Sequence, residues 1–336
     1  MEKFLTKLEK KTVSYLTYKK QLKIYEEDHK TKRTFLGELK GWVDALVFAI
    51  IVILIINQFL FQLYIIPSPS MEKTLLVKDR VFVNKNIFGL EPYPGGTKLG
   101  TKNRQVHRDN IITFYNPEYV SKGPVFDIVA QVLFMGTLSL VKIDRNEDGS
   151  LAERLLVKRA AAMNGDTVKF INGDVLIRAA GSSTFVNEST FRADNDLSDG
   201  PNRLIDSSYY EGMNAWATLY AYQEKGVTKD SLLPQYLKNE YKTLSDTSYP
   251  KDAYTFKTVE ANIEHKIDPT DFNSRSNNAI YKNGITVPEN YVLPLGDNRD
   301  NSNDGRYFGP VPQSSVTGQV LFRFWPLNRI GYLGNK

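Results

Sequence analysis

The hydrophobic pattern of the chain has one dominant feature, an apolar run near the N-terminus. Residues 42–66 read WVDALVFAIIVILIINQFLFQLYII, and residues 45–56 include no polar side chain. About 20 apolar residues are needed to cross a bilayer as a helix, and the run reaches that length with Trp42 and Tyr64 as interface anchors. The pattern therefore predicts a transmembrane anchor over residues 41–64.

Charge around this run predicts its orientation. Residues 1–40 carry eleven Lys/Arg against six Asp/Glu, which favours a solvated basic segment on the cytoplasmic side. Everything after about residue 65 should then lie outside. A rival reading is a cleavable signal peptide, with Ser68 and Ser70 as the small residues of its cleavage site. The 40-residue leader and the length of the run favour a retained anchor.

A second apolar run, VFDIVAQVLFMGTLSLV, covers residues 125–141. Its charge-free part, residues 128–141, is interrupted by Gln131. A stretch of about 10–14 residues is usually a core or interfacial element rather than a membrane span. We expect an interfacial or buried element here.

The rest of the chain alternates apolar and polar residues in short runs that are typical of strands. Residues 166–178, DTVKFINGDVLIR, predict a hairpin around Asn172-Gly173. The region 179–289 is polar and tyrosine-rich, and it predicts helices at WATLYAYQEKG and SLLPQYLKNEYKTL. The expected fold is mainly β, with antiparallel sheets formed by residues 65–178 and 290–336. Residues 179–289 should form an inserted α+β subdomain.

Composition excludes several classes of function. A net charge of +5 over 336 residues argues against a dedicated nucleic-acid binder, and the absence of cysteine rules out disulfides and thiolate chemistry. The histidines are His29, His107 and His265. None has the spacing of a zinc hydrolase, and none lies beside a nucleophile elbow. We therefore expect no metal, no cofactor and no histidine-based triad.

A serine can still become a nucleophile if a neutral lysine removes its proton. Burial among apolar groups lowers a lysine pKa. Lys158, in RLLVKRAAAM, is a candidate because apolar residues surround it in a predicted strand. A third segment, PLGDNRDNSNDGRYFGPVP at residues 294–312, is unusually rich in side chains that can form a buried polar network.

These segments together resemble the type I signal peptidases, the Ser–Lys leader peptidases of family S26. The resemblance rests on IPSPSM at 66–71, KRAAAMNGD at 158–166 and GDNRDNSNDGR at 296–306, with weaker similarity in HRDNIITFYNP at 107–117. It implies a signal-peptidase-type β core, Ser70 as nucleophile and Lys158 as general base. The Ser70 N–H and the Ser68 hydroxyl would form the oxyanion hole.

The same resemblance implies that Ser302 orients Lys158, and that a supporting network is formed by Asp297, Arg299, Asp304 and Arg306. No metal or nucleotide is required. Because Ser70 and Lys158 must meet, residues 125–141 cannot cross the membrane.

Several positions depart from the pattern of the family. Lys73 stands where proline is usual, Ala162 replaces a glycine, Asn164 replaces a proline, and Asn110 replaces the aspartate of RGD. Pro69 occupies a variable position and should bias the preceding serine toward an extended backbone. None of these changes removes a reactive group.

The implied function is a membrane-anchored serine endopeptidase that removes signal peptides from exported preproteins after a small-x-small site. Its partners would be preprotein signal peptides, the lipid bilayer and the protein export machinery, with no nucleic acid. It would sit in the inner (plasma) membrane as a single-pass protein, with the N-terminus cytoplasmic and the catalytic domain extracytoplasmic. The alternative is a non-catalytic membrane-anchored binding protein on the same fold.

Overall fold

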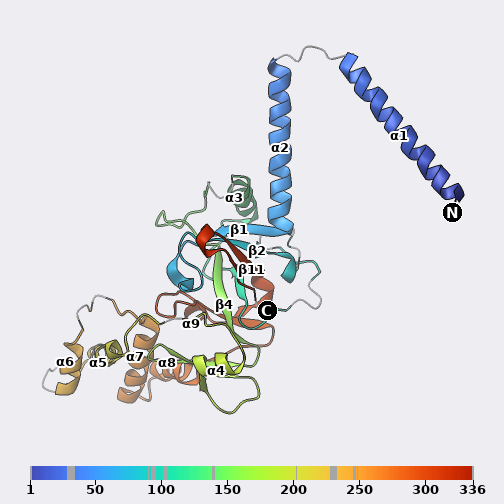
Figure 1. Cartoon of the computed structure of the whole chain (residues 1–336). Coiled ribbons are helices and arrows are strands. Elements are labelled where there is room, and N and C mark those ends of the chain that lie inside the picture. The colour runs from blue at the N-terminus through green and yellow to red at the C-terminus, as the bar shows by residue number, and fades with distance from the viewer. Residues whose placement is uncertain are drawn as a thin grey trace. The chain divides into compact units, whose positions relative to one another are not determined.

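The computed structural model divides the chain into two compact units, residues 1–53 and 54–336. It describes residues 2–28, 35–89, 91, 96–100, 105–137, 141–201, 203–227, 233–244, 247 and 249–334. Figure 1 shows the elements in chain order. His29 lies outside the described residues, as do residues 138–140 of the second apolar run and residues 231–232 of a predicted helix.

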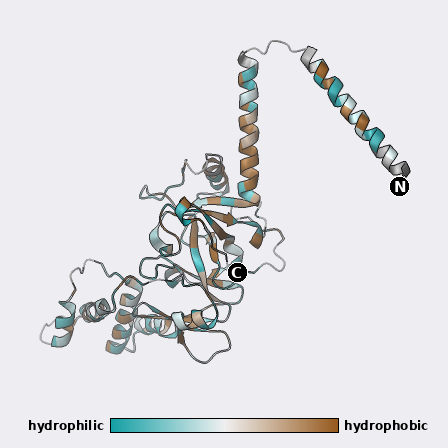
Figure 2. Ribbon diagram, in the orientation of Figure 1, coloured by the Kyte–Doolittle hydropathy of each residue, from teal (hydrophilic) through white to brown (hydrophobic). Residues whose placement is uncertain are grey.

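Two helices occupy the N-terminal part of the chain, α1 (Glu2–Asp28) and α2 (Phe35–Phe59). The helix over residues Gly37–Phe59 is long and apolar enough to cross a membrane. Figure 2 shows its hydrophobic colouring over most of its length. Helix α1 is basic, and its described side chains are exposed.

The apolar helix ends before residue 64, the predicted end of the anchor. The helix ends at Phe59, and Phe61–Ile65 form strand β1 instead of continuing the helix to residue 64. These residues pair with β2 (Arg80–Asn84) along their whole length, and their burial alternates as in a strand. Tyr64, expected as a membrane anchor, packs from β1 against a buried apolar cluster.

The larger sheet has eight antiparallel strands in the order β1-β2-β11-β3-β4-β9-β10, with β12 paired to β11. Their bounds are β1 (Phe61–Ile65), β2 (Arg80–Asn84), β3 (Ile111–Tyr115), β4 (Leu155–Met163), β9 (Tyr291–Leu295), β10 (Val311–Pro312), β11 (Val316–Trp325) and β12 (Gly331–Tyr332). Since each neighbour is antiparallel, β1, β11 and β4 run in the same direction.

The smaller sheet has the order β7-β6-β5-β8. Strands β5 (Thr167–Ile171) and β6 (Asp174–Arg178) form the predicted hairpin, and both turn residues, Asn172 and Gly173, have positive φ. Strands β7 (Val186–Asn187) and β8 (Ile285–Thr286) come from the ends of the inserted region. The hairpin prediction is confirmed, because residues that accept positive φ fix this turn.

Helices fill most of the inserted region. They are α4 (Glu188–Asp194), α5 (Ser207–Glu224), α6 (Gln235–Tyr241), α7 (Ala253–Ile267) and α8 (Phe272–Asn283). Helices α5 and α7 share a core around Met213 and Phe256. In Figure 1 these helices lie beyond the sheets, at the end away from β1. The mainly β fold with added helices is confirmed.

The second apolar run contains helix α3 (Pro124–Gly136). Five of its apolar residues are exposed and spaced as one helical face: Val125, Ile128, Val129, Val132 and Leu133. Gln131 donates a hydrogen bond of 3.3 Å to Gln58 in the last turns of α2. Helix α3 therefore lies beside the C-terminal end of α2. Single-turn helices complete the fold: η1 (Pro69–Met71), η2 (Asn86–Phe88), α9 (Gly305–Phe308), η4 (Gln313–Ser315) and η5 (Leu327–Arg329).

Candidate active site

The serine turn that follows β1 is a compact, largely buried element. Ser68 is extended (φ −128°, ψ 159°), as expected for a residue before proline, and Pro69 begins the short helix η1. Ser70 is 8% exposed and Met71 is 1% exposed. The turn is thus anchored by Met71 in the apolar cluster beneath it.

Lys158 lies in the middle of β4 and is 3% exposed. Its Nζ is 2.7 Å from Ser70 Oγ. Burial lowers the pKa of Lys158, and the nearby Asp304 carboxylate offsets only part of that effect. Lowering the pKa increases the neutral fraction of the amine, which is the form that can accept a proton. The strand and the turn therefore bring a serine hydroxyl and a weakly basic amine into direct contact.

Two further serines were predicted at this site. Ser68 donates a hydrogen bond of 3.3 Å to Ser70 Oγ, so its hydroxyl lies on the same side of the turn as the Ser70 hydroxyl. Ser302 Oγ is buried without a hydrogen-bond partner in the described structure, so the expected bond to Lys158 is not formed here. A Cβ on Gly296 would come within 2.5 Å of both Ser302 Oγ and the Ser70 carbonyl oxygen. Gly296 is therefore the residue that lets these two segments approach.

Asn298 fixes the serine turn from the opposite segment. Its N–H donates to the Ser70 carbonyl at 3.1 Å, and its Nδ2 donates to the Pro69 carbonyl at 3.2 Å. The Ser70 carbonyl gains a partner in this way, and the Pro69 carbonyl, which also accepts the Glu72 N–H at 2.9 Å, gains a second one. This role of Asn298 was not predicted, although the residue lies within the polar cluster at residues 294–312.

Asp297 binds a guanidinium from the same strand as Lys158. Arg159 donates from Nε to Asp297 Oδ1 at 2.7 Å and from Nη2 to Oδ2 at 2.6 Å, and Thr74 Oγ1 donates to Oδ2 at 2.5 Å. Burial alone would raise the pKa of Asp297, but the hydrogen bonds and charge of Arg159 lower it below the usual range. This ion pair ties the serine turn, β4 and the segment after β9 together.

The other three network residues form two separate contacts. Arg306 donates to Asp304 at 2.9 Å, and Asp304 accepts the Gly296 N–H at 2.9 Å. Arg299 is 2% exposed and donates to Glu188 of the inserted region, from Nε at 3.1 Å and from Nη2 at 2.6 Å. Asp304 thus lies beside the Lys158 segment, whereas Arg299 connects the core to the insert.

The substituted RGD position is rearranged around Asp109. Asn110 accepts the His107 N–H at 2.9 Å, while Asp109 takes a positive φ of 69°. The Asp109 carboxylate lies 3.2 Å from Arg159 and 2.5 Å from Arg192 of α4. The roles of Arg159 and Arg192 were not predicted, because partners so far apart in the chain leave no local pattern.

Comparison with known proteins supports the motif resemblance. The model of the family described as "Signal peptidase, peptidase S26" matches residues 39–325. The chain is 25% identical over 282 residues to Signal peptidase I of Aquifex aeolicus, covering 82% of this chain and 80% of that protein. It is 24% identical over 307 residues to Signal peptidase I of Helicobacter pylori, covering 88% and 85%. A shorter match, to Signal peptidase I of Leptolyngbya laminosa, is 50% identical over 48 residues and covers 14% and 24%. The chain belongs to the signal peptidase family, peptidase S26.

Proposed function

We propose that this protein is a membrane-anchored serine endopeptidase that removes N-terminal signal peptides from exported preproteins, cutting after a small-x-small site. One observation carries the proposal most directly, the 2.7 Å contact between Lys158 Nζ and Ser70 Oγ in a buried site. Membership of the signal peptidase family and the names of the long relatives agree with it.

In the proposed mechanism Lys158 is neutral and accepts the proton of the Ser70 hydroxyl. Ser70 Oγ then attacks the carbonyl carbon of the last residue of the leader, and the bond from this carbon to the first nitrogen of the mature protein breaks. The Ser70 N–H and the Ser68 hydroxyl donate to the oxyanion that develops. One such donor is typically worth about 3–4 kcal/mol of transition-state stabilisation. The lysine passes its proton to the leaving amine, and then activates the water that hydrolyses the acyl-enzyme.

A strand edge next to Lys158 supports extended binding of the substrate. Strand β4 pairs with β3 from Leu155 to Arg159, but with β9 only from Arg159 onward. Among the described strands, the second edge of β4 at residues 155–158 has no neighbour. A leader segment can add to this edge through main-chain hydrogen bonds. Its small side chains would then face the apolar cluster that contains Ile66 and Met71.

The membrane arrangement follows from α2 and the start of β1. The apolar helix ends only two residues before β1, which leads directly to the serine turn. We propose that α2 spans the inner membrane with the basic N-terminus in the cytoplasm. Helix α3 would then lie at the extracytoplasmic surface of this inner membrane. A reporter fused after residue 145 should be extracytoplasmic; a cytoplasmic reporter would refute the single crossing.

Cleavage by the detergent-solubilised full chain tests the chemistry. The wild type should cut a preprotein with an Ala-x-Ala site, whereas Ser70→Ala and Lys158→Ala should lose at least about 10³-fold in kcat/KM. Ser182→Ala, which alters an exposed serine in a turn, is the matched control. Fully active Ser70→Ala or Lys158→Ala would overturn these assignments. A folded wild type that binds leaders without cutting them would favour the non-catalytic alternative.

A further inference from the structure

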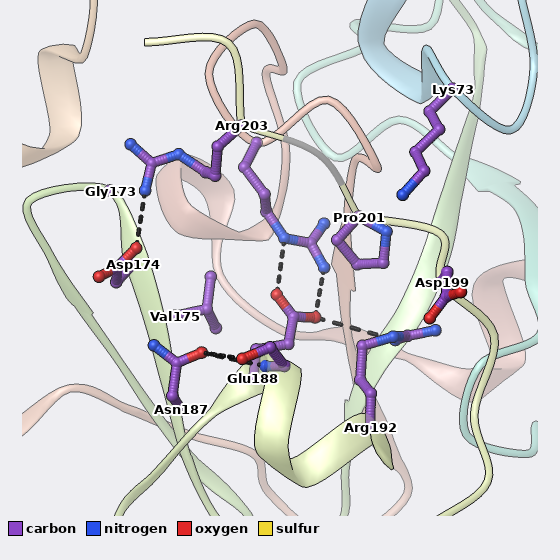
Figure 3. Close-up of a pocket in the computed structure, with 12 residues that line it drawn as sticks. Lys73, Gly173, Asp174, Val175, Asn187, Glu188, Arg192, Asp199, Pro201 and Arg203 are labelled. Carbon is purple, nitrogen blue, oxygen red and sulfur yellow. Dashed lines mark hydrogen bonds and ion pairs between the residues drawn. The ribbon is translucent and has the colours of Figure 1, made fainter. Parts of the chain in front are cut away.

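A polar pocket begins three residues after Ser70. It has a volume of about 430 Å³, and it is lined by Lys73, by the turn of the β5–β6 hairpin, by α4 and by Arg299. Figure 3 shows Lys73 reaching into this space from the segment that follows the serine turn. Lys73 is also the residue that replaces the usual proline of the family, so the pocket contains a side chain that the common motif would not supply.

Most charges in the pocket are neutralised by neighbours. Glu188 accepts from Arg299 at 2.6 Å, Arg192 binds Asp109 at 2.5 Å, and Arg203 binds Asp174 at 3.0 Å.

Lys73 differs from these arginines. It is exposed, and no ion pair or hydrogen bond connects it to another residue in the described part of the chain. Figure 3 shows its ammonium directed toward the pocket without a contact. Asp199, in the loop after α4, is likewise exposed and unpaired there. Lys73 therefore offers an available positive charge, and Asp199 offers an opposing negative one.

Strand direction indicates what reaches the pocket. Strand β1 leaves the end of α2 and leads to Ser70, and β4 runs in the same direction. A preprotein whose leader is still in the bilayer must enter at the α2 end, so its mature part continues beyond Ser70. Figure 1 shows α4 and the rest of the insert beyond the sheets, away from β1. The pocket is thus on the exit side of the cleaved bond.

On the basis of the endopeptidase function proposed above, we propose that this pocket is a subsite for the first residues of the mature protein, and that Lys73 favours an acidic residue there. An extended chain advances about 3.3 Å per residue, so the second to fourth residues after the cleaved bond are the ones within reach of the pocket. The attraction between opposite charges at an exposed site raises binding affinity by a few-fold, and salt weakens this effect by screening the charges.

The backbone at Lys73 makes a clean charge test possible. Its φ of 82° lies in the left-handed region, which Asn and Asp tolerate better than other non-glycine residues. Lys73→Asn removes the positive charge and Lys73→Asp replaces it by a negative one. The two variant side chains have nearly the same shape, so they differ from each other mainly in charge. Lys78 has a φ of 73° and is exposed, but it does not line the pocket. Lys78→Asp is therefore a control with the same change in charge and in backbone preference.

The assay compares three peptides that share an Ala-x-Ala site and carry Glu, Gln or Lys at the third position after it. Full-length wild type in detergent should cleave the Glu peptide about fivefold faster than the Lys peptide in kcat/KM. The ratio should be near one in Lys73→Asn, inverted in Lys73→Asp, and unchanged in Lys78→Asp. Asp199→Asn should raise it about twofold, and 0.5 M NaCl should reduce it toward one.

A wild-type ratio near one, a ratio unchanged in Lys73→Asp, or an equal change in Lys78→Asp would overturn the subsite while leaving the endopeptidase intact. Failure of the wild type to cleave any of the three peptides would instead overturn both proposals.

Discussion

Replacing Asp297 by asparagine tests how the residues beside Ser70 and Lys158 are held. The substitution keeps the shape of the side chain but removes its charge. Of the two ion pairs that Arg159, which is 3% exposed, makes within the described residues, the 3.2 Å pair with Asp109 would then remain, together with hydrogen bonds to neutral groups. Removing one member of a buried ion pair costs about 3–5 kcal/mol, because the remaining charge has no water to replace its partner. Since Asp109 remains, we expect the lower end, about 3 kcal/mol.

This loss can be measured by thermal unfolding of the detergent-solubilised full chain at a fixed scan rate. In a chain of this size 1 kcal/mol corresponds to about 2 °C, so Tm should fall by about 6 °C. Asp174→Asn is the control, because the Asp174 side chain is 61% exposed and its pair with Arg203 lies at the surface. Such pairs contribute at most about 1 kcal/mol. A drop of less than 2 °C for Asp297→Asn, or equal drops for both variants, would refute this reasoning.

The pH dependence gives an independent check on the same residue. The pKa of Asp297 is lowered in the folded protein, despite its burial, by the hydrogen bonds and charge of Arg159. A lowered carboxyl pKa stabilises the fold above the unfolded value of about 3.9, and the benefit disappears as pH falls through the folded value. The Tm difference between wild type and Asp297→Asn should therefore be constant above about pH 5 and shrink below about pH 4. A difference that is the same at every pH would show that lost packing, rather than lost charge, destabilises the variant.

Three further predictions concern the chemistry and the membrane. Because burial lowers the pKa of Lys158, kcat/KM should rise with pH through a midpoint below the ordinary lysine value of about 10.4; a pH–rate profile with its midpoint at 10.4 would contradict this. Gly296→Ala would place a Cβ 2.5 Å from the Ser70 carbonyl oxygen, so the free energy of unfolding should fall by about 1–3 kcal/mol and kcat should fall more than tenfold. A fully active variant would show that the turn can shift freely. Val125→Glu with Val129→Glu should weaken binding to lipid vesicles and cleavage of a membrane-inserted preprotein, while cleavage of a soluble peptide stays unchanged; equal losses on both substrates would place the effect outside the membrane contact.

Local patterns predicted the elements that depend on neighbouring residues. The hairpin followed from Asn172-Gly173, and the extended backbone of Ser68 followed from Pro69. The end of α2 could not be read in the same way, because hydropathy does not separate an apolar helix from an apolar strand. Strand β1 is fixed by its pairing with β2, which lies about 20 residues further along the chain.

Contacts between distant segments were beyond the reach of the sequence pattern. The Asp297 carboxylate was expected in a network, but its partner Arg159 precedes it by 138 residues. Glu188 and Arg192 lie in the insert, where no motif marked them, yet they connect the insert to the core through Arg299 and Asp109. Such pairs are selected by three-dimensional packing, so residue type alone identifies candidates and not partners.

The proline missing after Met71 is best understood through what holds the serine turn. Asn298 donates hydrogen bonds to the carbonyl oxygens of Pro69 and Ser70, and Met71 is buried. The turn is therefore fixed before the chain reaches Lys73. Lys73 then takes φ 82°, which proline cannot adopt because its ring holds φ near −65°. The chain therefore leaves the turn by a path that a proline would forbid. That path directs an ammonium toward the polar pocket, so the departure from the motif changes what lies beyond Ser70 rather than the contact between Ser70 and Lys158.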